Sequence, residues 1–189
     1  MSASTNRPMP FVSDDSLLLG QNATETVLKA EDLTRFQTLA FATHGLLAGE
    51  ISGLQEAGLI MTPPAAATAI DDGYLSASDI AALNLNTDVV LLSACNTAAP
   101  EQVGAEGLSG LAKAFFFAGA RNLVVSHWAV DSTATAALTT QMFENRAKAA
   151  NKSYASALGD AMRDLRAVDA GRFAHPLYWG PFEVVGADM

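Results

Sequence analysis

The only cysteine in the chain and one of its three histidines stand at the ends of apolar runs. Cys95 closes the run 87–95, and His44 closes the run 36–44. A thiol needs a base to become a thiolate near neutral pH, and histidine is the usual base. The two residues are 51 positions apart. If their runs are neighbouring parallel strands, about 4.8 Å apart, both residues reach the same edge of a sheet. The spacing favours a Cys-His pair, although Cys95 alone is typical of a small core side chain and His44 alone of an ordinary strand end.

Further residues at the ends of apolar runs suit acyl transfer to and from a thiol. Such chemistry needs backbone N–H groups aimed at the developing oxyanion, and the amides of Gly45 and Cys95 are the candidate pair. Gly45 is equally typical of a simple turn. Asn96 begins the loop expected to border a substrate, and Trp128 and Asp131 follow another apolar run at 121–128. These residues predict a substrate-binding edge.

Other chemistries lack their motifs. The sequence has no Gly-x-x-x-x-Gly-Lys loop for phosphoryl transfer and no Gly-x-Ser-x-Gly elbow for a serine hydrolase. One cysteine and three histidines in unrelated contexts fit no zinc spacing. His175, which precedes a proline, is expected to be structural. We therefore expect neither a metal nor a cofactor.

The elements that position these residues alternate between strands and helices. Continuous apolar runs predict strands, and capping residues followed by apolar residues at helical spacing predict helices. An α/β sandwich around a mostly parallel sheet follows, with its chemistry at the carboxyl ends of the strands. Strands are predicted over 16–20, 36–45, 87–95, 121–128 and 182–185, a hairpin over 58–76, and helices over 24–33, 76–83, 108–119, 132–149 and 153–167.

Composition narrows the functional classes. Half of the 189 residues are apolar, which suits one globular domain, and the net charge of −9 argues against nucleic acid as a ligand. No apolar run reaches the roughly 20 residues that cross a bilayer, so no membrane partner is expected. A single cysteine excludes an internal disulfide and indicates a reducing compartment. We predict a cytoplasmic domain over 16–187, preceded by a flexible lead over residues 1–15.

Four segments together resemble a known family. FATHG, LSACNT, GAEGLSGLAKAFFFAGARNLVVSHWAVDS and HPLYWGPFEVVG are similar, in this order, to motifs of the CHAT domain. This caspase-like module is related to the separases and is usually found behind TPR repeats in bacteria. The resemblance covers about residues 16–187. It implies a caspase–hemoglobinase fold, a three-layer α/β sandwich with a mostly parallel sheet flanked by helices, and a Cys-His dyad that cleaves peptide bonds.

The resemblance also implies a role for each matching residue. Cys95 becomes the nucleophile, and His44 the general base and then the acid for the leaving amine. Gly45 and Cys95 supply the oxyanion-hole amides. Asp131 becomes the acid that selects Arg or Lys on the acyl side of the scissile bond, although an aspartate there equally suits a helix N-terminus. Trp128 and Asn96 are assigned to substrate binding.

One departure from the family pattern concerns the beginning of the chain. Family members usually carry another strand and helix there, with that first strand inside the sheet. We therefore expect an N-terminally truncated relative, or the C-terminal part of a longer protein with an upstream TPR sensor region. The sequence leaves two functions open: a cysteine endopeptidase acting on a protein or peptide, or a catalytically silent domain for protein interaction or regulation.

Overall fold

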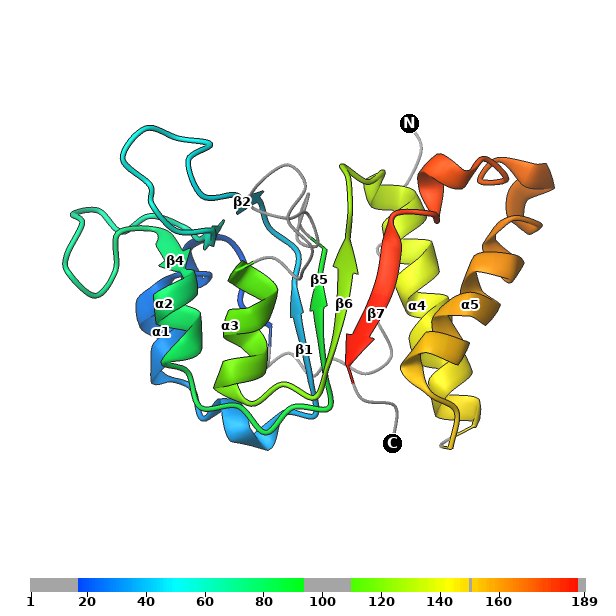
Figure 1. Ribbon diagram of the computed structural model, residues 1–189, viewed down its shortest axis with the longest axis horizontal. Coiled ribbons are helices and arrows are strands. Elements are labelled where there is room, and N and C mark those ends of the chain that lie inside the picture. The colour runs from blue at the N-terminus through cyan, green and yellow to red at the C-terminus, as the bar shows by residue number, and fades with distance from the viewer. Residues whose placement is uncertain (1–16, 94–109, 150, 187–189) are drawn as a thin grey trace.

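The computed structural model describes residues 17–93, 110–149 and 151–186. The predicted lead over residues 1–15 lies outside them, as do Cys95 and Asn96. The described residues form a four-stranded sheet between two layers of helices, with a smaller three-stranded sheet beside it (Figure 1). This mixed α/β arrangement is compatible with a caspase-like sandwich and confirms the predicted fold class.

The main sheet is mostly parallel. Its strands are β1 (Thr38–Phe41), β5 (Val89–Leu92), β6 (Asn122–Ser126) and β7 (Phe182–Gly186), in the order β1-β5-β6-β7. β1 pairs with β5 and β5 with β6 in parallel, whereas β7 runs antiparallel to β6. The carboxyl ends of the three parallel strands therefore meet the amino end of β7 at one edge, at the top of Figure 1.

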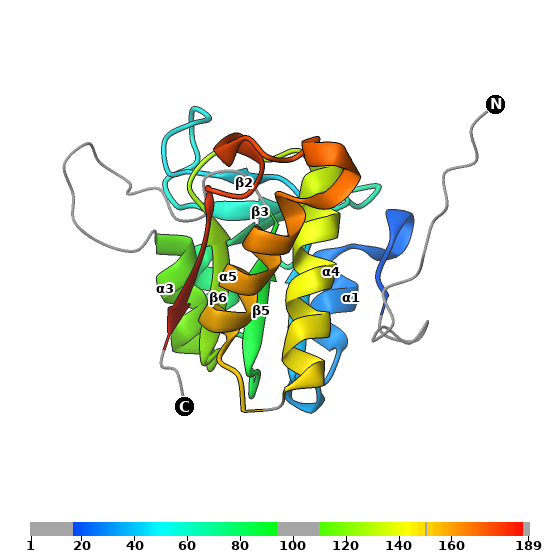
Figure 2. The same ribbon diagram turned by 90° about the vertical axis from the view of Figure 1, so that its right-hand side faces the viewer.

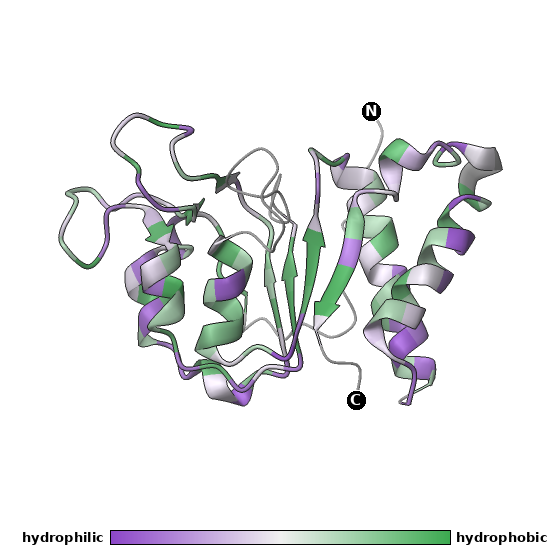
Figure 3. Cartoon of the chain, viewed as in Figure 1, coloured by the Kyte–Doolittle hydropathy of each residue, from purple (hydrophilic) through white to green (hydrophobic). Residues whose placement is uncertain are grey.

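The central strands β5 and β6 are buried at every position and are mostly apolar, whereas the edge strands β1 and β7 are partly exposed (Figure 3). In β5 the side chains alternate between two cores: Val90 and Leu92 face one, and Val89 and Leu91 face the other. Phe115, which is fully buried, anchors the first core and packs against Phe41 with ring centroids 5.3 Å apart and the rings tilted by 51°. This contact fixes the end of β1 that leads to His44.

The α-helices of the described residues lie on both faces of the main sheet (Figures 1 and 2). On one side lie α1 (Glu25–Ala30), α2 (Ala77–Ala81) and α3 (Gly110–Ala118), and on the other lie α4 (Ser132–Lys148) and α5 (Tyr154–Leu165). Short 3-10 turns occupy Gly20–Asn22, Leu33–Arg35, Val168–Gly171 and Pro176–Tyr178. Thr24 caps α1, and Ser76 and Asp79 form the predicted capping box of α2.

The smaller sheet consists of β2 (Gly45–Leu46), β3 (Gly58–Ile60) and β4 (Tyr74–Ser76), all antiparallel. The hairpin predicted over 58–76 is thus confirmed as β3 and β4. β2 adds to its outer side directly after His44. The small sheet therefore extends from the carboxyl end of β1.

The strand predicted over 16–20 is wrong in its described part. Residues 17–19 form no ladder, and Gly20 begins a 3-10 turn. Leu17 and Leu19 are 48% and 65% exposed. Leu19 has extended backbone angles, but an extended segment becomes a strand only when a neighbouring strand pairs with it.

Candidate active site

The pairing register of β1 and β5 matches the spacing of the predicted dyad. Thr38 lies opposite Val89 and Phe41 opposite Leu92, a constant offset of 51 positions. The Ser93 amide donates to the Phe41 carbonyl at 2.9 Å and carries the ladder one step further. The two strands therefore end at the same level. His44 follows Phe41 by three positions, as Cys95 follows Leu92 in the sequence.

The backbone at His44 is fixed while its side chain is exposed. The His44 carbonyl accepts a hydrogen bond from the Ile60 amide at 2.8 Å, and the Thr43 hydroxyl donates to the Ile60 carbonyl. Gly45 then pairs with Leu59. In this antiparallel pattern the residue after a bonded carbonyl turns its own N–H away from the partner strand. The Gly45 amide thus points away from β3.

The other predicted binding residues follow β6. Trp128 is 39% exposed. The Asp131 carboxylate accepts a hydrogen bond from the Ala134 amide at 2.8 Å and is the N-cap of α4. The capping interpretation of Asp131 is therefore confirmed, and a contact with substrate stays a prediction. His175 caps a 3-10 turn through the Leu177 amide at 3.1 Å, the structural role expected for it.

A buried carboxylate that sequence analysis missed secures the small sheet. Glu25 on α1 is 2% exposed, and its Oε1 accepts from the amides of Asp72, Gly73 and Tyr74 at 3.0, 3.0 and 3.1 Å. Its Oε2 lies 2.7 Å from Lys29 Nζ. β4 begins at Tyr74, so this carboxylate anchors the strand that, through β3, holds β2. The four-residue spacing of Glu25 and Lys29 was the only sequence signal, and it indicates a surface pair.

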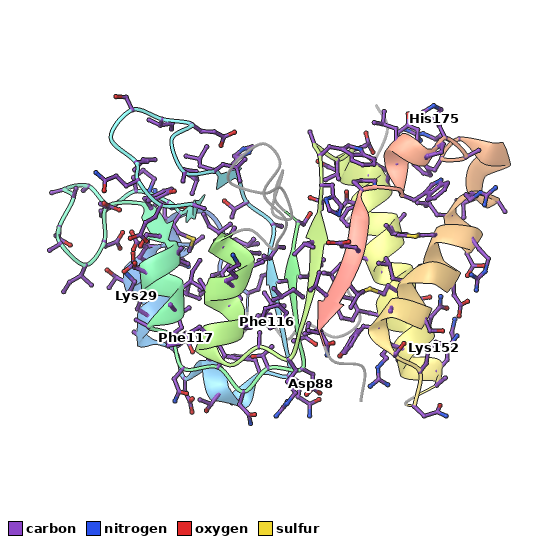
Figure 4. All side chains as sticks on the ribbon, viewed as in Figure 1. Lys29, Asp88, Phe116, Phe117, Lys152 and His175 are labelled. Carbon is purple, nitrogen blue, oxygen red and sulfur yellow. The ribbon has the colours of Figure 1, made fainter. Side chains whose placement is uncertain are left out.

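Lys29 extends this cluster to α2 (Figure 4). Its ammonium lies 2.9 Å from Asp79 Oδ1 and 2.9 Å from the Ile70 carbonyl. Partial burial acts to raise the pKa of Asp79, but the hydrogen bonds from Ser76 and Lys29 outweigh burial and lower it. Partial burial likewise acts to lower the pKa of Lys29, and its bonds to the two carboxylates raise it. Both groups are therefore held in their charged forms.

A second unpredicted pair lies at the carboxyl end of β6. His127 Nε2 is 3.2 Å from Glu183 Oε2, on β7. The His127 amide donates to the Pro181 carbonyl at 3.0 Å. The sequence around Glu183 predicts only a strand, because the register of β7 on β6 is not visible in the sequence.

Residues 17–93, 110–149 and 151–186 contain neither a cluster of metal ligands nor a membrane-spanning helix. Within these ranges, no three His, Cys, Asp or Glu side chains converge as a metal site would require. Nor does any helix in them combine the length and apolar composition of a membrane span.

Comparison with known proteins identifies the family. A family model described as the CHAT domain matches residues 6–187. Tetratricopeptide repeat protein 28 from Mus musculus is 31% identical over 115 residues, which are 61% of this chain and 4% of that protein. The Homo sapiens protein of the same name is 30% identical over 115 residues, with the same coverage. The chain thus spans only a small part of the length of these relatives. The family match extends over almost the whole sequence, and the chain therefore belongs to the CHAT domain family.

Proposed function

We propose that this caspase-like domain is a cysteine endopeptidase with Cys95 as nucleophile and His44 as general base. The observation that carries the proposal is the register of β1 on β5, whose offset of 51 positions equals the spacing of the two residues. Two strands that end at one level bring the segments that follow them to one edge of the sheet. The exposed His44 side chain on a fixed backbone supports the same assignment.

The proposed reaction is acyl transfer through a thioester. The His44 imidazole takes the proton of the Cys95 thiol, and the thiolate attacks the carbonyl carbon of the scissile peptide bond. The Gly45 and Cys95 amides stabilise the oxyanion, and the orientation of the Gly45 amide away from β3 supports its part in this. His44 then protonates the leaving amine. Water, deprotonated by His44, hydrolyses the thioester and releases the second product.

The substrate is proposed to be a protein or peptide chain. Asp131 would select Arg or Lys beside the scissile bond, with Trp128 and Asn96 lining the site. Because capping uses one hydrogen bond of the Asp131 carboxylate, a second contact is compatible with it. The names of the relatives support an upstream tetratricopeptide repeat region in a longer parent protein, where it would act as the sensor. We propose the cytoplasm as the compartment.

Alkylation of the thiol tests the dyad directly. The chain has one cysteine, so every alkylated thiol reports Cys95. We expect iodoacetamide to react at pH 6.5 much faster with the folded protein than with the unfolded protein, and His44→Ala to remove the difference. His175→Ala is the matched control, because this histidine is also exposed and Figure 4 shows it at the top of the view, the edge of the molecule where the parallel strands end.

A peptidyl-arginine acyloxymethyl ketone then tests the peptidase. We expect it to modify Cys95 in the wild type and in His175→Ala, but not in His44→Ala. Alkylation that is independent of His44, or a folded protein that the ketone does not modify, would contradict the proposal and support a catalytically silent domain.

A further inference from the structure

His127 and Glu183 form an ion pair held at the carboxyl end of β6. The His127 amide is bound to the Pro181 carbonyl, and Glu183 lies opposite Val125 in the β6–β7 ladder. Both backbones are therefore fixed. The two side chains stay accessible, with 42% and 43% of their surfaces exposed. A ligand at this edge of the sheet can therefore reach the Glu183 carboxylate without a change in the backbone.

The partner of Glu183 is the unusual feature of this pair. The other ion pairs in residues 17–93, 110–149 and 151–186 all use a Lys or Arg, which is charged at neutral pH. His127 is charged only when protonated. Glu183 is thus paired with a histidine ring, which offers at most two N–H donors. A guanidinium or ammonium group is a stronger partner, because it keeps its charge and offers several N–H donors.

The pair also lies within reach of the proposed scissile bond. β6 is next to β5, and β7 is next to β6. Adjacent strands are about 4.8 Å apart, so β7 lies about 10 Å from β5. An extended peptide advances about 3.3 Å per residue, so a substrate that crosses the ends of β5, β6 and β7 reaches Glu183 about three residues from the end of β5. Trp128, 39% exposed and next to His127, offers an apolar surface on the way.

We propose that Glu183 is a specificity residue that binds an Arg or Lys side chain of the substrate about three residues from the scissile bond. His127 is its partner in the free protein, and the basic side chain replaces it. This inference rests on the proposed peptidase function and adds a second basic position to the one assigned to Asp131. The predicted substrates are therefore peptides with two basic residues separated by a short spacer.

Binding without cleavage isolates this contact. The experiment uses the Cys95→Ala variant and acetylated octapeptides of Ala and Ser, with a single Arg moved through all eight positions. A matched series carries citrulline, which keeps the shape of Arg and lacks its charge. Dissociation constants come from isothermal titration at pH 7.5. Besides the position assigned to Asp131, at one further position about three residues away we expect Arg to bind about fivefold more tightly than citrulline, the range of a partly exposed ion pair.

Two further substitutions assign the contact to one carboxylate. Glu183→Gln should remove the Arg preference at that position. Glu144→Gln, which removes the charge of an α4 carboxylate paired with Lys148, should keep it. A preference that survives Glu183→Gln, a preference removed only by Asp131→Asn, or a folded protein that binds none of the peptides overturns the inference. Urea unfolding of Glu183→Gln checks that the variant is folded.

The outcome is separable from the fate of the peptidase proposal. If the Arg preference depends on Glu183 but alkylation of the wild-type thiol does not depend on His44, the protein has a site for basic peptides and the peptidase proposal is contradicted. If His44 activates the wild-type thiol but Glu183 contributes nothing to peptide binding, the peptidase proposal stands and the proposed Glu183 site is contradicted.

Discussion

Glu25 gives the sharpest test of how the small sheet is held. In the folded protein its Oε1 accepts three amides and its Oε2 pairs with Lys29, while only 2% of the residue is exposed. Glu25→Ala removes both functions at once. Glu25→Gln keeps one acceptor oxygen for the amides and removes the negative charge that faces Lys29. The two variants therefore separate the hydrogen bonds from the ion pair.

The magnitudes follow from the groups left behind. Each buried donor that loses its acceptor costs about 1–3 kcal/mol. Tyr74 keeps the Asp72 carboxylate at 2.9 Å as a second acceptor, and Lys29 keeps Asp79, so the loss stays below that of a fully broken buried pair. We expect Glu25→Ala to lower the free energy of unfolding by about 3–4 kcal/mol, and Glu25→Gln by about 1–2 kcal/mol.

Urea unfolding, followed by circular dichroism, measures both losses. The control is Glu144→Ala, because its pair with Lys148 is 3.9 Å long and the lysine is 70% exposed; it should change stability by less than about 0.5 kcal/mol. A loss of less than about 1 kcal/mol for Glu25→Ala would show that Glu25 does not anchor β4. Equal losses for the two Glu25 variants would refute the separation of hydrogen bonds from charge.

Three further predictions concern single positions. Asp131→Ala should lower the free energy of unfolding by about 1 kcal/mol, because it removes the cap of α4. Asp131→Asn should keep the cap and reduce kcat/KM only for peptides with Arg or Lys. Equal destabilisation by the two variants would contradict this prediction. The lowered pKa of Asp79 means that its contribution to stability is present above its unfolded pKa, about 3.9, and is lost as the pH falls through the folded value. The difference in urea midpoint between wild type and Asp79→Asn should therefore be seen at pH 6 and shrink below pH 4, and a constant difference would refute the linkage. Gly119 has φ +115°, and a Cβ there would lie 2.2 Å from a backbone oxygen, so Gly119→Ala should destabilise the protein by about 1–3 kcal/mol. Gly159 lies in the open interior of α5, so Gly159→Ala should stabilise the protein by about 0.5–1 kcal/mol. Changes of the same sign for both variants in urea unfolding would contradict this prediction.

The central strands of the main sheet could be predicted because their burial on both faces is visible in their apolar composition. Val89–Leu92 is apolar at every position, as a strand covered by helices on both faces must be. The same reasoning failed at residues 17–19. There the leucines suggested a strand, but strand formation depends on an available neighbour rather than on local composition. Local signals do not encode that condition.

The candidate site was predictable only where it follows strand ends. The placement of His44 and Gly45 after β1 came from the apolar pattern alone. The anchoring of β4 by Glu25 joins residues 47–49 positions apart, and the contact of Glu183 with His127 depends on the register of two antiparallel strands. Neither contact produces a regular residue spacing from which it could be predicted. Pairs of this kind become visible only when the chain is folded.

Because the pairing of β1 with β5 has a constant offset, the alignment of the two strand ends does not depend on the length of the chain between the strands. The level at which the two strands end is set by the ladder from Thr38↔Val89 to Phe41↔Leu92, and the number of residues between Ala42 and Asp88 has no part in it. Doubling a flexible loop costs only about 0.6 kcal/mol. An affinity tag or a small folded domain inserted at the exposed tip, around residues 65–67, would therefore leave the strand ends in step. One extra residue between Phe41 and His44 would instead shift His44 relative to the end of β5.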